Sequence, residues 1–177
     1  MSIEKLKSSL RTVPDFPKPG ILFWDVTTLF KDATCLRELE DVLYECYKDK
    51  GITKVVGLES RGFVMGPALA IRLGAGFVMA RKPGKLPADT YSESYMKEYG
   101  PDTIEIHKDA IGPDDVVLIH DDLLATGGTM EATYNLCRKL GVTKVYLNCI
   151  IELVDLQGRK RLPADLDFYC PVVYEGE

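Results

Sequence analysis

The fold of this chain is decided by the stretch Val116-Val117-Leu118-Ile119-His120-Asp121-Asp122-Leu123-Leu124-Ala125-Thr126-Gly127-Gly128-Thr129. It begins with four apolar residues, which are typical of a parallel strand buried on both faces. Two adjacent carboxylates follow at the carboxyl end, where open α/β sheets bind their ligands. The small residues Ala125 to Thr129 predict a turn whose N–H groups, with the Thr126 and Thr129 hydroxyls, converge on an anion at the start of a helix. This order predicts a site for a phosphorylated sugar.

The stretch does not match the other common nucleotide-binding loops. No Gly-x-x-x-x-Gly-Lys-Ser/Thr follows a strand and no Gly-x-Gly-x-x-Gly opens a helix, so neither a P-loop NTPase nor a Rossmann dehydrogenase is expected. A plainer alternative is a strand–turn–helix junction in which the glycines serve only the turn. Two acids and Thr-Gly-Gly-Thr directly after an apolar run favour the phosphate site.

Composition limits the class of protein. A length of 177 residues suits a single domain, residues 1–177, that needs neither disulfides nor metals to fold. The five cysteines are odd in number and lack a C-x-x-C pair, so we expect reduced thiols in a cytoplasmic protein. No window approaches the roughly 20 apolar residues of a membrane span, and the amino terminus lacks a signal-peptide core. A formal charge of −5 argues against non-specific nucleic-acid binding, so a small ligand is expected.

The remaining pattern predicts an α/β fold with a central, mainly parallel sheet flanked by helices. Apolar runs at 55–58, 77–80 and 145–151 alternate with helical patterns at 63–73 and 130–140. An earlier amphipathic helix is expected to start near Asp32 and to stop at Gly51.

Two segments depart from this alternation. Residues 14–25 contain too many prolines for a regular element and predict an ordered hood, within about residues 1–30. The interval from Arg81 to Gly112 is long and polar, which is typical of a lid. Residues 91–100 alternate aromatic and polar side chains, which predicts a β-ribbon over 90–99. We therefore expect a flexible β-ribbon lid at about 83–103 that includes Tyr95 and Tyr99.

Basic side chains follow two other strands of the predicted sheet. Glu59-Ser60-Arg61-Gly62 places an Arg fork and the Ser60 and Gly62 amides at one carboxyl end, and Arg81-Lys82-Pro83-Gly84-Lys85 places three cations at another. Each cluster alone has a plainer explanation, which is an Arg61 that is paired with Glu59 or simply solvated in the first cluster and solvated surface in the second. Convergence of all three loops on one sheet edge favours a polyphosphate pocket.

The stretch at 116–129 resembles the 5-phosphoribosyl-1-pyrophosphate (PRPP) signature of type I phosphoribosyltransferases. Further blocks resemble the adenine phosphoribosyltransferase branch of that family and cover nearly the whole chain. They are Phe16-Pro17-x-Pro19-Gly20-Ile21-x-Phe23-x-Asp25, Glu59-Ser60-Arg61-Gly62-Phe63, Arg81-Lys82-Pro83-Gly84-Lys85-Leu86-Pro87 and Tyr95-x-x-Glu98-Tyr99-Gly100.

The resemblance implies the type I phosphoribosyltransferase fold and a reversible purine-salvage reaction of adenine with PRPP, giving AMP and pyrophosphate. It implies Mg²⁺ bound mainly through PRPP, with at most water-mediated contact to Asp121 or Asp122, and a homodimer. Four residues are implied to be catalytic: Glu98, Asp121, Asp122 and Arg61. The implied phosphate cup is Ala125, Thr126, Gly127, Gly128 and Thr129. Pyrophosphate is implied to bind Ser60, Arg61, Arg81, Lys82 and Lys85. Adenine is implied to bind Ile21, Leu22, Phe23, Trp24 and Leu123.

Two residues depart from the family pattern, because Trp24 stands where Arg is common and His120 where an aliphatic residue is usual. At Trp24 a direct polar contact near the base or phosphate is expected to be missing or replaced by stacking, and His120 is expected to be a satisfied buried group. Two other functions share the PRPP cup: a 6-oxopurine or xanthine phosphoribosyltransferase, and a PRPP-sensing regulator. The Glu-Ser-Arg-Gly block weighs against the first. The acidic composition and the retained Glu98 weigh against the second.

Overall fold

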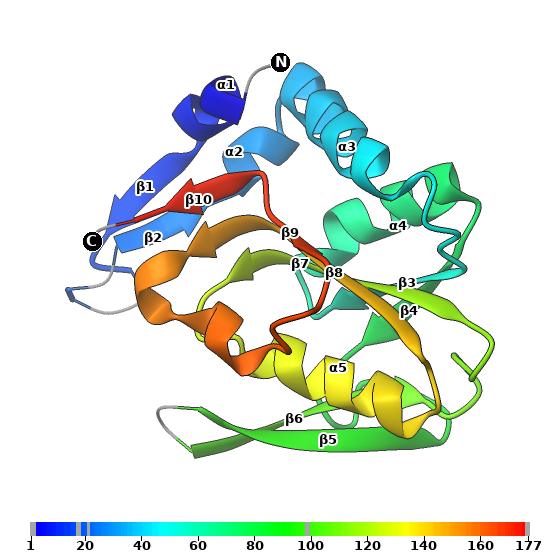
Figure 1. Ribbon diagram of the computed structural model, residues 1–177. Helices are drawn as coiled ribbons and strands as arrows, with labels where there is room; N and C mark the ends of the chain where they lie inside the picture. Colours follow the sequence, from blue (N-terminus) through cyan, green and yellow to red (C-terminus); the bar gives the residue numbers. More distant parts are fainter. Residues whose placement is uncertain (1–2, 17–18, 21, 98–99, 176–177) are drawn as a thin grey trace.

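A parallel β-sheet occupies the centre of the computed structural model, which describes residues 3–16, 19–20, 22–97 and 100–175 (Figure 1). Within these residues the strand order is β10-β8-β7-β3-β4, β9 pairs with β8, and every pairing is parallel. The strands are β3 (Lys54–Leu58), β4 (Gly76–Ala80), β7 (Val116–Leu124), β8 (Lys144–Leu153), β9 (Phe168–Tyr169) and β10 (Val172–Tyr174). The expected mainly parallel sheet is confirmed, and each predicted apolar run lies in one of its strands.

Helices cover one face of the sheet, while one helix and a two-stranded ribbon cover the other (Figure 1). The first face carries α1 (Ile3–Ser9), α2 (Thr27–Phe30), α3 (Ala33–Tyr47) and α4 (Gly62–Leu73). The second carries α5 (Gly128–Lys139), and two short 3-10 helices, η1 (Val154–Leu156) and η2 (Gly158–Arg161), follow β8. Because both faces are covered, the central strands are apolar along most of their length.

The helix boundaries follow local chemistry. The Asp32 side chain accepts hydrogen bonds from the backbone N–H groups of Thr34 and Cys35, at 2.9 and 2.8 Å, so it caps α3 as expected. That helix ends at Tyr47, four residues before Gly51, where the chain turns toward β3. The helices predicted at 63–73 and 130–140 are α4 and α5, each shifted by one or two residues.

The hood contains a regular element that the sequence interpretation missed. Strands β1 (Arg11–Pro14) and β2 (Leu22–Asp25) pair antiparallel, so the expectation that prolines exclude regular structure from 14–25 is wrong. Pro14 is the last residue of β1, and a proline at a strand end removes little of the hydrogen-bond ladder. Asp25 then ties the hairpin to α2, since its carboxylate accepts from Arg11 Nε at 3.1 Å and from Thr27 N at 2.9 Å.

The ribbon beneath α5 extends further than the expected lid. Strands β5 (Thr90–Lys97) and β6 (Gly100–His107) pair antiparallel over their full length, so the ribbon continues past residue 103, while the lid boundaries of about 83–103 stay a prediction. The reason is burial, because Ile104 and Ile106 are fully buried in the same core cluster as α5. Backbone hydrogen bonds between Arg81 and Glu105, at 2.9 and 2.7 Å, also join the base of the ribbon to the end of β4.

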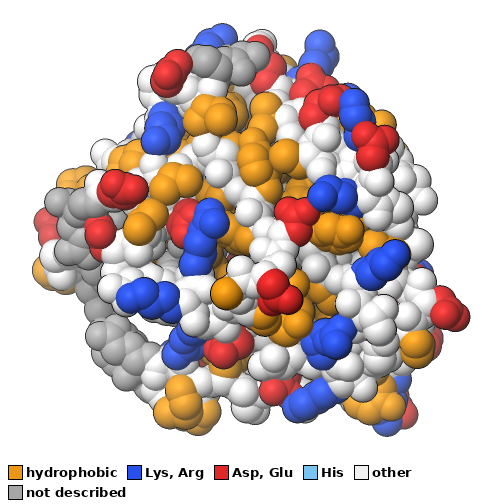
Figure 2. Space-filling view, viewed as in Figure 1, with side chains coloured by type: hydrophobic (Ala, Val, Ile, Leu, Met, Phe, Trp, Pro, Cys, Tyr) orange, Lys and Arg blue, Asp and Glu red, His pale blue; other side chains and the backbone are white. Residues whose placement is uncertain are grey.

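The surface and the thiols agree with the composition. Positive and negative side chains are interspersed over the face seen in Figure 2, without a large area of one sign. No helix among the residues described has the length and apolar character that crossing a membrane requires. All five cysteines are free thiols, three of them buried.

Candidate active site

The site lies where the direction of the strand order reverses. From β3 the chain passes to β4 at one side and later returns to β7 at the other, and Gly57 of β3 lies opposite His120 of β7. Ligands of open α/β sheets bind in the crevice outside the strand ends at such a point. The Glu59–Gly62 loop and the acid pair therefore meet at one edge. The acids lie within β7 rather than after it, because β8 continues to pair with β7 through Leu124.

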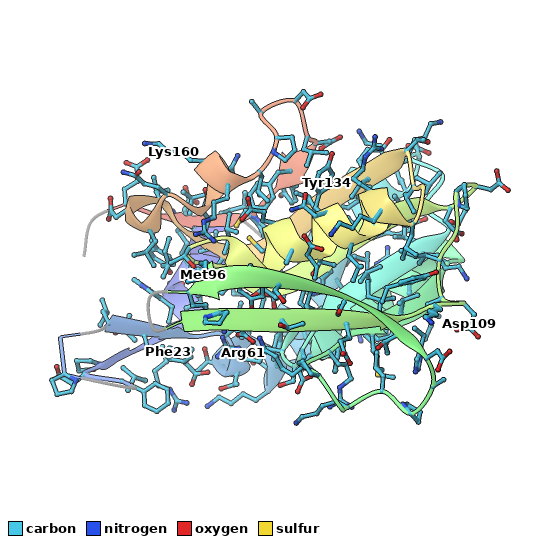
Figure 3. The ribbon with its side chains drawn as sticks, turned by 90° about the horizontal axis from the view of Figure 1, so that it is seen from below. Phe23, Arg61, Met96, Asp109, Tyr134 and Lys160 are labelled. Carbon is cyan, nitrogen blue, oxygen red and sulfur yellow. The ribbon has the colours of Figure 1, made fainter. Side chains whose placement is uncertain are left out.

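An ion pair joins these two loops directly. Arg61 Nε lies 2.6 Å from Asp122 Oδ2, and the Asp122 side chain is almost fully buried while that of Arg61 is half exposed. The guanidinium also lies over the Phe23 ring of the hood, 5.2 Å from its centroid. Figure 3 shows Phe23 and Arg61 side by side, below the end of the ribbon at Met96. Arg61 thus contacts both the sheet and the hood, so the alternative of an Arg paired with Glu59 is wrong.

Gly62 allows this approach. A Cβ at Gly62 would lie 2.8 Å from the His120 carbonyl oxygen, closer than such atoms approach in proteins. The amino end of α4 can therefore pass directly over β7 only with glycine at this position.

The environment makes the acid pair hard to ionise. Burial raises the pKa of Asp121 well above its usual value, and the neighbouring Asp122 carboxylate raises it further. Burial also raises the pKa of Asp122, while the Arg61 guanidinium opposes that rise. Asp121 Oδ1 accepts a hydrogen bond from Asp122 N at 2.8 Å. Two carboxylates with raised pKa values favour ligands that bring hydroxyl donors or positive charge.

A cavity of about 290 Å³ joins Asp121 of the acid pair to the predicted phosphate cup. Its lining combines the acid strand, the Thr-Gly-Gly-Thr turn and the ribbon: Tyr95, Lys97, Asp121, Leu123, Leu124, Ala125, Thr126, Gly127, Gly128, Thr129 and Met130. All five predicted phosphate-cup residues and Leu123 are therefore brought together. The turn opens α5, a 12-residue helix whose positive end faces the cavity.

The cup rests on a segment that the sequence interpretation did not single out. Gly127 has φ +80°, and a Cβ there would lie 2.5 Å from the carbonyl oxygen of Gly158 in η2. A Cβ at Gly158 would in turn meet the Ala125 carbonyl oxygen, and would lie 3.1 Å from Gly127 N. The two backbones touch because both residues are glycines. Gly127 and Gly158 are 31 positions apart in the sequence. The only local signal of their contact is that each residue is a glycine.

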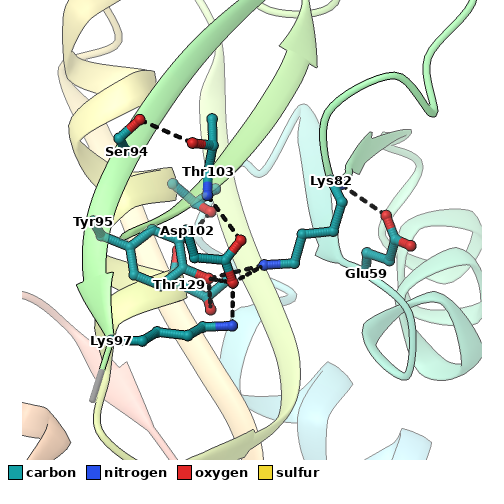
Figure 4. A network of polar contacts seen from close by, with 9 residues as sticks. Glu59, Lys82, Ser94, Tyr95, Lys97, Asp102, Thr103 and Thr129 are labelled. Atoms are coloured by element: carbon teal, nitrogen blue, oxygen red, sulfur yellow. Dashed lines mark hydrogen bonds and ion pairs between the residues drawn. The ribbon is translucent and has the colours of Figure 1, made fainter. Parts of the chain in front are cut away.

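The ribbon contacts the cup through a polar network (Figure 4). Tyr95 Oη lies 2.7 Å from Thr129 Oγ1, 3.1 Å from Asp102 Oδ2 and 3.0 Å from Lys82 Nζ. Asp102 also forms ion pairs with Lys82 and Lys97. Lys82 thus points to the ribbon, and Asp102, which the sequence interpretation missed, is the centre of this network.

The other predicted pyrophosphate ligands surround Glu59. Arg81 Nε lies 3.3 Å and Lys85 Nζ 3.5 Å from its carboxylate, which also accepts from Lys82 N at 2.8 Å. Burial raises the pKa of Glu59, but the hydrogen bonds from Lys82 and Arg81 outweigh it and lower the pKa overall. Ser60 immediately precedes Arg61 in the chain. Arg81 and Lys85 are thus held by an internal carboxylate, and neither belongs to the lining of the cavity described above.

The predicted adenine-binding residues divide into three groups. Leu123 lines the cavity, whereas in strand β2 of the hood hairpin Leu22 is exposed and Phe23 is half-buried. Trp24 stacks on Tyr174 of β10, with ring centroids 3.5 Å apart and an interplanar angle of 22°. Its stacking partner is therefore the carboxyl-terminal strand. Ile21, Glu98 and Tyr99 lie outside the described residues.

His120 is only partly satisfied, contrary to expectation. It is fully buried, and Nδ1 lies 2.7 Å from Asn148 Oδ1, but Nε2 has no hydrogen-bond partner among the described residues. Burial lowers its pKa to about 4, so the ring is neutral at pH 7. The Asn148 amide reaches only one ring nitrogen.

Comparison with known proteins agrees with this geometry. The family described as "Phosphoribosyl transferase domain" matches residues 25–170. A curated relative from Phocaeicola vulgatus, named adenine phosphoribosyltransferase, is 69% identical and covers 94% of this chain and 95% of its own. The crystal structure of adenine phosphoribosyltransferase from Rhodothermus marinus superposes with a TM-score of 0.92 at 53% identity, over 97% of this chain and 98% of that one. The Giardia lamblia enzyme, complexed with 9-deazaadenine, has a TM-score of 0.93 at 40% identity and covers 99% of both chains. The chain therefore belongs to the phosphoribosyltransferase family, in its adenine phosphoribosyltransferase branch.

Proposed function

We propose that this protein is an adenine phosphoribosyltransferase, which transfers 5-phosphoribosyl from PRPP to adenine and releases pyrophosphate. The observation that carries the proposal is one cavity lined both by Asp121 of the buried acid pair and by the Thr-Gly-Gly-Thr cup, with Asp122 beside Asp121 in the ion pair with Arg61. The names of its relatives and the adenine analogue held by the Giardia lamblia enzyme support the choice of base.

The proposed chemistry uses the acid pair and the cup together. Breaking the bond between ribose C1 and pyrophosphate leaves an oxocarbenium-like sugar. Carboxylates at Asp121 and Asp122 would accept hydrogen bonds from the ribose hydroxyls and stabilise the developing positive charge. The amides of residues 125–129 and the Thr126 and Thr129 hydroxyls would hold the 5-phosphate at the positive end of α5.

Pyrophosphate is assigned to Ser60, Arg61, Arg81, Lys82 and Lys85. In the structure the Arg and Lys side chains of this set are paired with carboxylates of the chain itself, namely Asp122, Glu59 and Asp102. Binding of a pyrophosphate would exchange these internal partners for a ligand of higher charge, which bidentate Arg contacts favour. The internal carboxylates keep the cationic loops in place before the ligand binds.

The donor set fits a Mg²⁺ that is held mainly by its substrate. Hard oxygen ligands suit Mg²⁺, and it usually binds proteins through one or two carboxylates together with substrate phosphates. Asp121 and Asp122 supply two carboxylates, and no cluster of three or more metal-binding side chains occurs in the described part of the chain. When bound, Mg²⁺ would supply charge neutralisation at the pyrophosphate and ribose oxygens, with any contact to Asp121 or Asp122 through water.

Adenine is assigned to the space between the hood and Leu123. Leu22 and Phe23 would cover one side of the ring, while Ile21 and Trp24 complete the expected hood set. Glu98 is proposed to contact adenine N7 and to act as an acid as N9 attacks, and Tyr99 to belong to the closing lid. Loss of an acid–base group of this kind costs about 10²-fold or more in rate.

Two further assignments concern assembly and location. We propose a homodimer, supported by three exposed apolar side chains on α4 and β4: Val64, Ile71 and Met79. Light scattering of the purified protein tests it. We also propose a cytoplasmic location, supported by five free thiols without a disulfide framework.

The test of function is a spectrophotometric assay with PRPP, Mg²⁺ and each of adenine, hypoxanthine, guanine and orotate. Turnover with adenine alone is expected. Turnover of another base with none on adenine would overturn the base assignment, and binding of PRPP without turnover of any base would indicate a sensor. Glu98→Ala should lower kcat by about 10²-fold or more, whereas Glu175→Ala, at the far end of the chain, serves as a matched control.

A further inference from the structure

Two of the five cysteines are brought face to face by strand register. Strand β9 pairs Leu147 with Phe168 and Asn148 with Tyr169, and continuing that register sets Cys170 opposite Cys149. Strand β10 pairs Ile151 with Val172, and extending that register back gives the same result. Neighbouring strands lie about 4.7–4.9 Å apart, within the roughly 4.4–6.8 Å Cα separation of disulfide-bonded cysteines.

The two thiols lie on the same face of the sheet. Cys149 belongs to the core cluster under α5, and Cys170 packs against that same cluster. Each Sγ–H donates to the carbonyl oxygen two residues further on, Cys149 to Ile151 at 3.1 Å and Cys170 to Val172 at 3.2 Å. Because Ile151 and Val172 are register partners, the two side chains run in the same direction side by side.

Burial and charge assign different roles to the two sulfurs. Cys149 is fully buried, whereas Cys170 is half-buried and more accessible to a small reagent. Burial, followed by the adjacent Cys170 thiol, raises the pKa of Cys149, so it stays protonated at pH 7. The Arg159 guanidinium lies over the Phe168 ring, 4.3 Å from its centroid, close to the Cys170 loop.

We propose that Cys149 and Cys170 form a reversible, redox-sensitive pair that closes to an intramolecular disulfide when a peroxide is present. The Cys170 thiolate attacks one oxygen of hydrogen peroxide, which breaks the O–O bond, forms Cys170 sulfenic acid and releases hydroxide. The Cys149 sulfur then attacks the Cys170 sulfur. The S–O bond breaks, and the Cys149 proton leaves with the hydroxyl group as water. Both sulfurs are oxidised by one peroxide, which is reduced to water and hydroxide.

The pair is connected to the candidate active site. Cys149 lies opposite Asp121 in the β7–β8 register, so Asp121, Cys149 and Cys170 form one row across three neighbouring chain segments. Closing the disulfide also keeps Cys170 from the irreversible sulfinic and sulfonic acids. The row therefore places a reversible oxidation event next to the acid pair.

The experiment treats the native full-length protein with hydrogen peroxide, unfolds it in acid, and alkylates the remaining thiols. Trypsin then places the two residues in different peptides, because Cys149 is the only cysteine of peptide 145–159 and Cys170 is the only cysteine of peptide 162–177. A cross-linked species of these two peptides, lost on treatment with dithiothreitol, is expected. Cys46, half-buried like Cys170, is the internal control and should remain alkylated or oxidise alone.

Two variants separate pairing from simple reactivity. Cys149→Ser should abolish the cross-link and leave a Cys170 sulfenic acid that dimedone traps, and Cys149→Ala repeats the test if the first variant folds poorly. Cys46→Ser should leave the cross-link unchanged. Recovery of Cys170 only as sulfinic or sulfonic acid, with Cys149 still fully alkylated in the parent protein, would overturn the proposal.

Discussion

The hydroxyl of Tyr95 in the ribbon lies 2.7 Å from the hydroxyl of Thr129 in the phosphate cup. The same Tyr95 oxygen lies 3.1 Å from Asp102 Oδ2 on the opposite strand of the ribbon. One side chain therefore connects both strands of the proposed lid to the first turn of α5. A phosphate that binds Thr129 must either share this hydroxyl or replace it, so ligand binding and ribbon position are linked.

Replacing Tyr95 by Phe tests this link. The variant keeps the ring, which packs in the core, but removes the hydrogen bonds to Thr129 and Asp102. We expect a loss of about 1 kcal/mol, or roughly fivefold in kcat/KM for PRPP. Steady-state kinetics with varied PRPP measure it. Tyr91→Phe, on the same strand but half exposed, is the matched control. Equal effects of the two variants would show that Tyr95 does not link ribbon and cup.

The acid pair predicts a stability that falls as pH rises. Because the pKa of Asp121 is raised above its ordinary value of 3.8, the folded state binds the proton more tightly than the unfolded state. That stabilisation is complete below pH 3.8 and is lost as pH rises toward the folded pKa. Each tenfold difference in proton affinity corresponds to about 1.4 kcal/mol. We therefore expect Asp121→Asn to be more stable than the parent at pH 7 and much less active.

Urea unfolding at several pH values from 4 to 8 measures this difference. Asn keeps the oxygen that accepts from Asp122 N, so the backbone contact at 2.8 Å is retained. The gap between variant and parent should widen as pH rises. A variant that is less stable than the parent at pH 7 would show that ionised Asp121 is not a cost to the fold.

The hydrogen bonds of Asp25 predict a contribution to folding stability that depends on pH in the opposite sense. Burial raises its pKa, but hydrogen bonds from Thr27 and Arg11 outweigh burial and lower the pKa to about 2. Its stabilisation is present above pH 3.8 and is lost as pH falls toward 2. Since Arg11 is half exposed and screened by solvent, we expect Asp25→Asn to cost about 1–2 kcal/mol at pH 7. Thermal melts of parent and variant should converge at low pH, and a constant difference at every pH would contradict this origin.

Local patterns predicted the sheet and the cup because both are encoded over short distances. The apolar run at 116–119, the acid pair and the Thr-Gly-Gly-Thr turn follow one another, and strand ends of a parallel sheet share an edge. The cap at Asp32 is equally local, since its side chain reaches only the next turn. These elements were found where the sequence placed them.

The elements that were missed depend on contacts between distant segments. Strand β6 continues to His107 because Ile104 and Ile106 are buried by α5, and no local feature marks that burial. Trp24 finds its partner in Tyr174, 150 residues later. Lys82 was assigned to a ligand from its basic neighbours, yet Asp102 lies close enough to bind it. Pairing across the fold was the information that the sequence pattern lacked.

Gly158 provides the sharpest test of how the phosphate cup is supported. Although it lies 30 positions after Gly128, a Cβ at this residue would collide with the Ala125 carbonyl oxygen and would lie 3.0 Å from Leu124 Cγ. Overpacking of this kind costs about 1–3 kcal/mol, and the cup must shift to relieve it. We expect Gly158→Ala to raise KM for PRPP by about tenfold or more while KM for adenine changes less. Gly112→Ala is the matched control, because a Cβ there meets nothing within 4 Å. Isothermal titration with PRPP alone checks the binding step, and an unchanged affinity in a folded Gly158→Ala protein would mean that η2 does not support the cup.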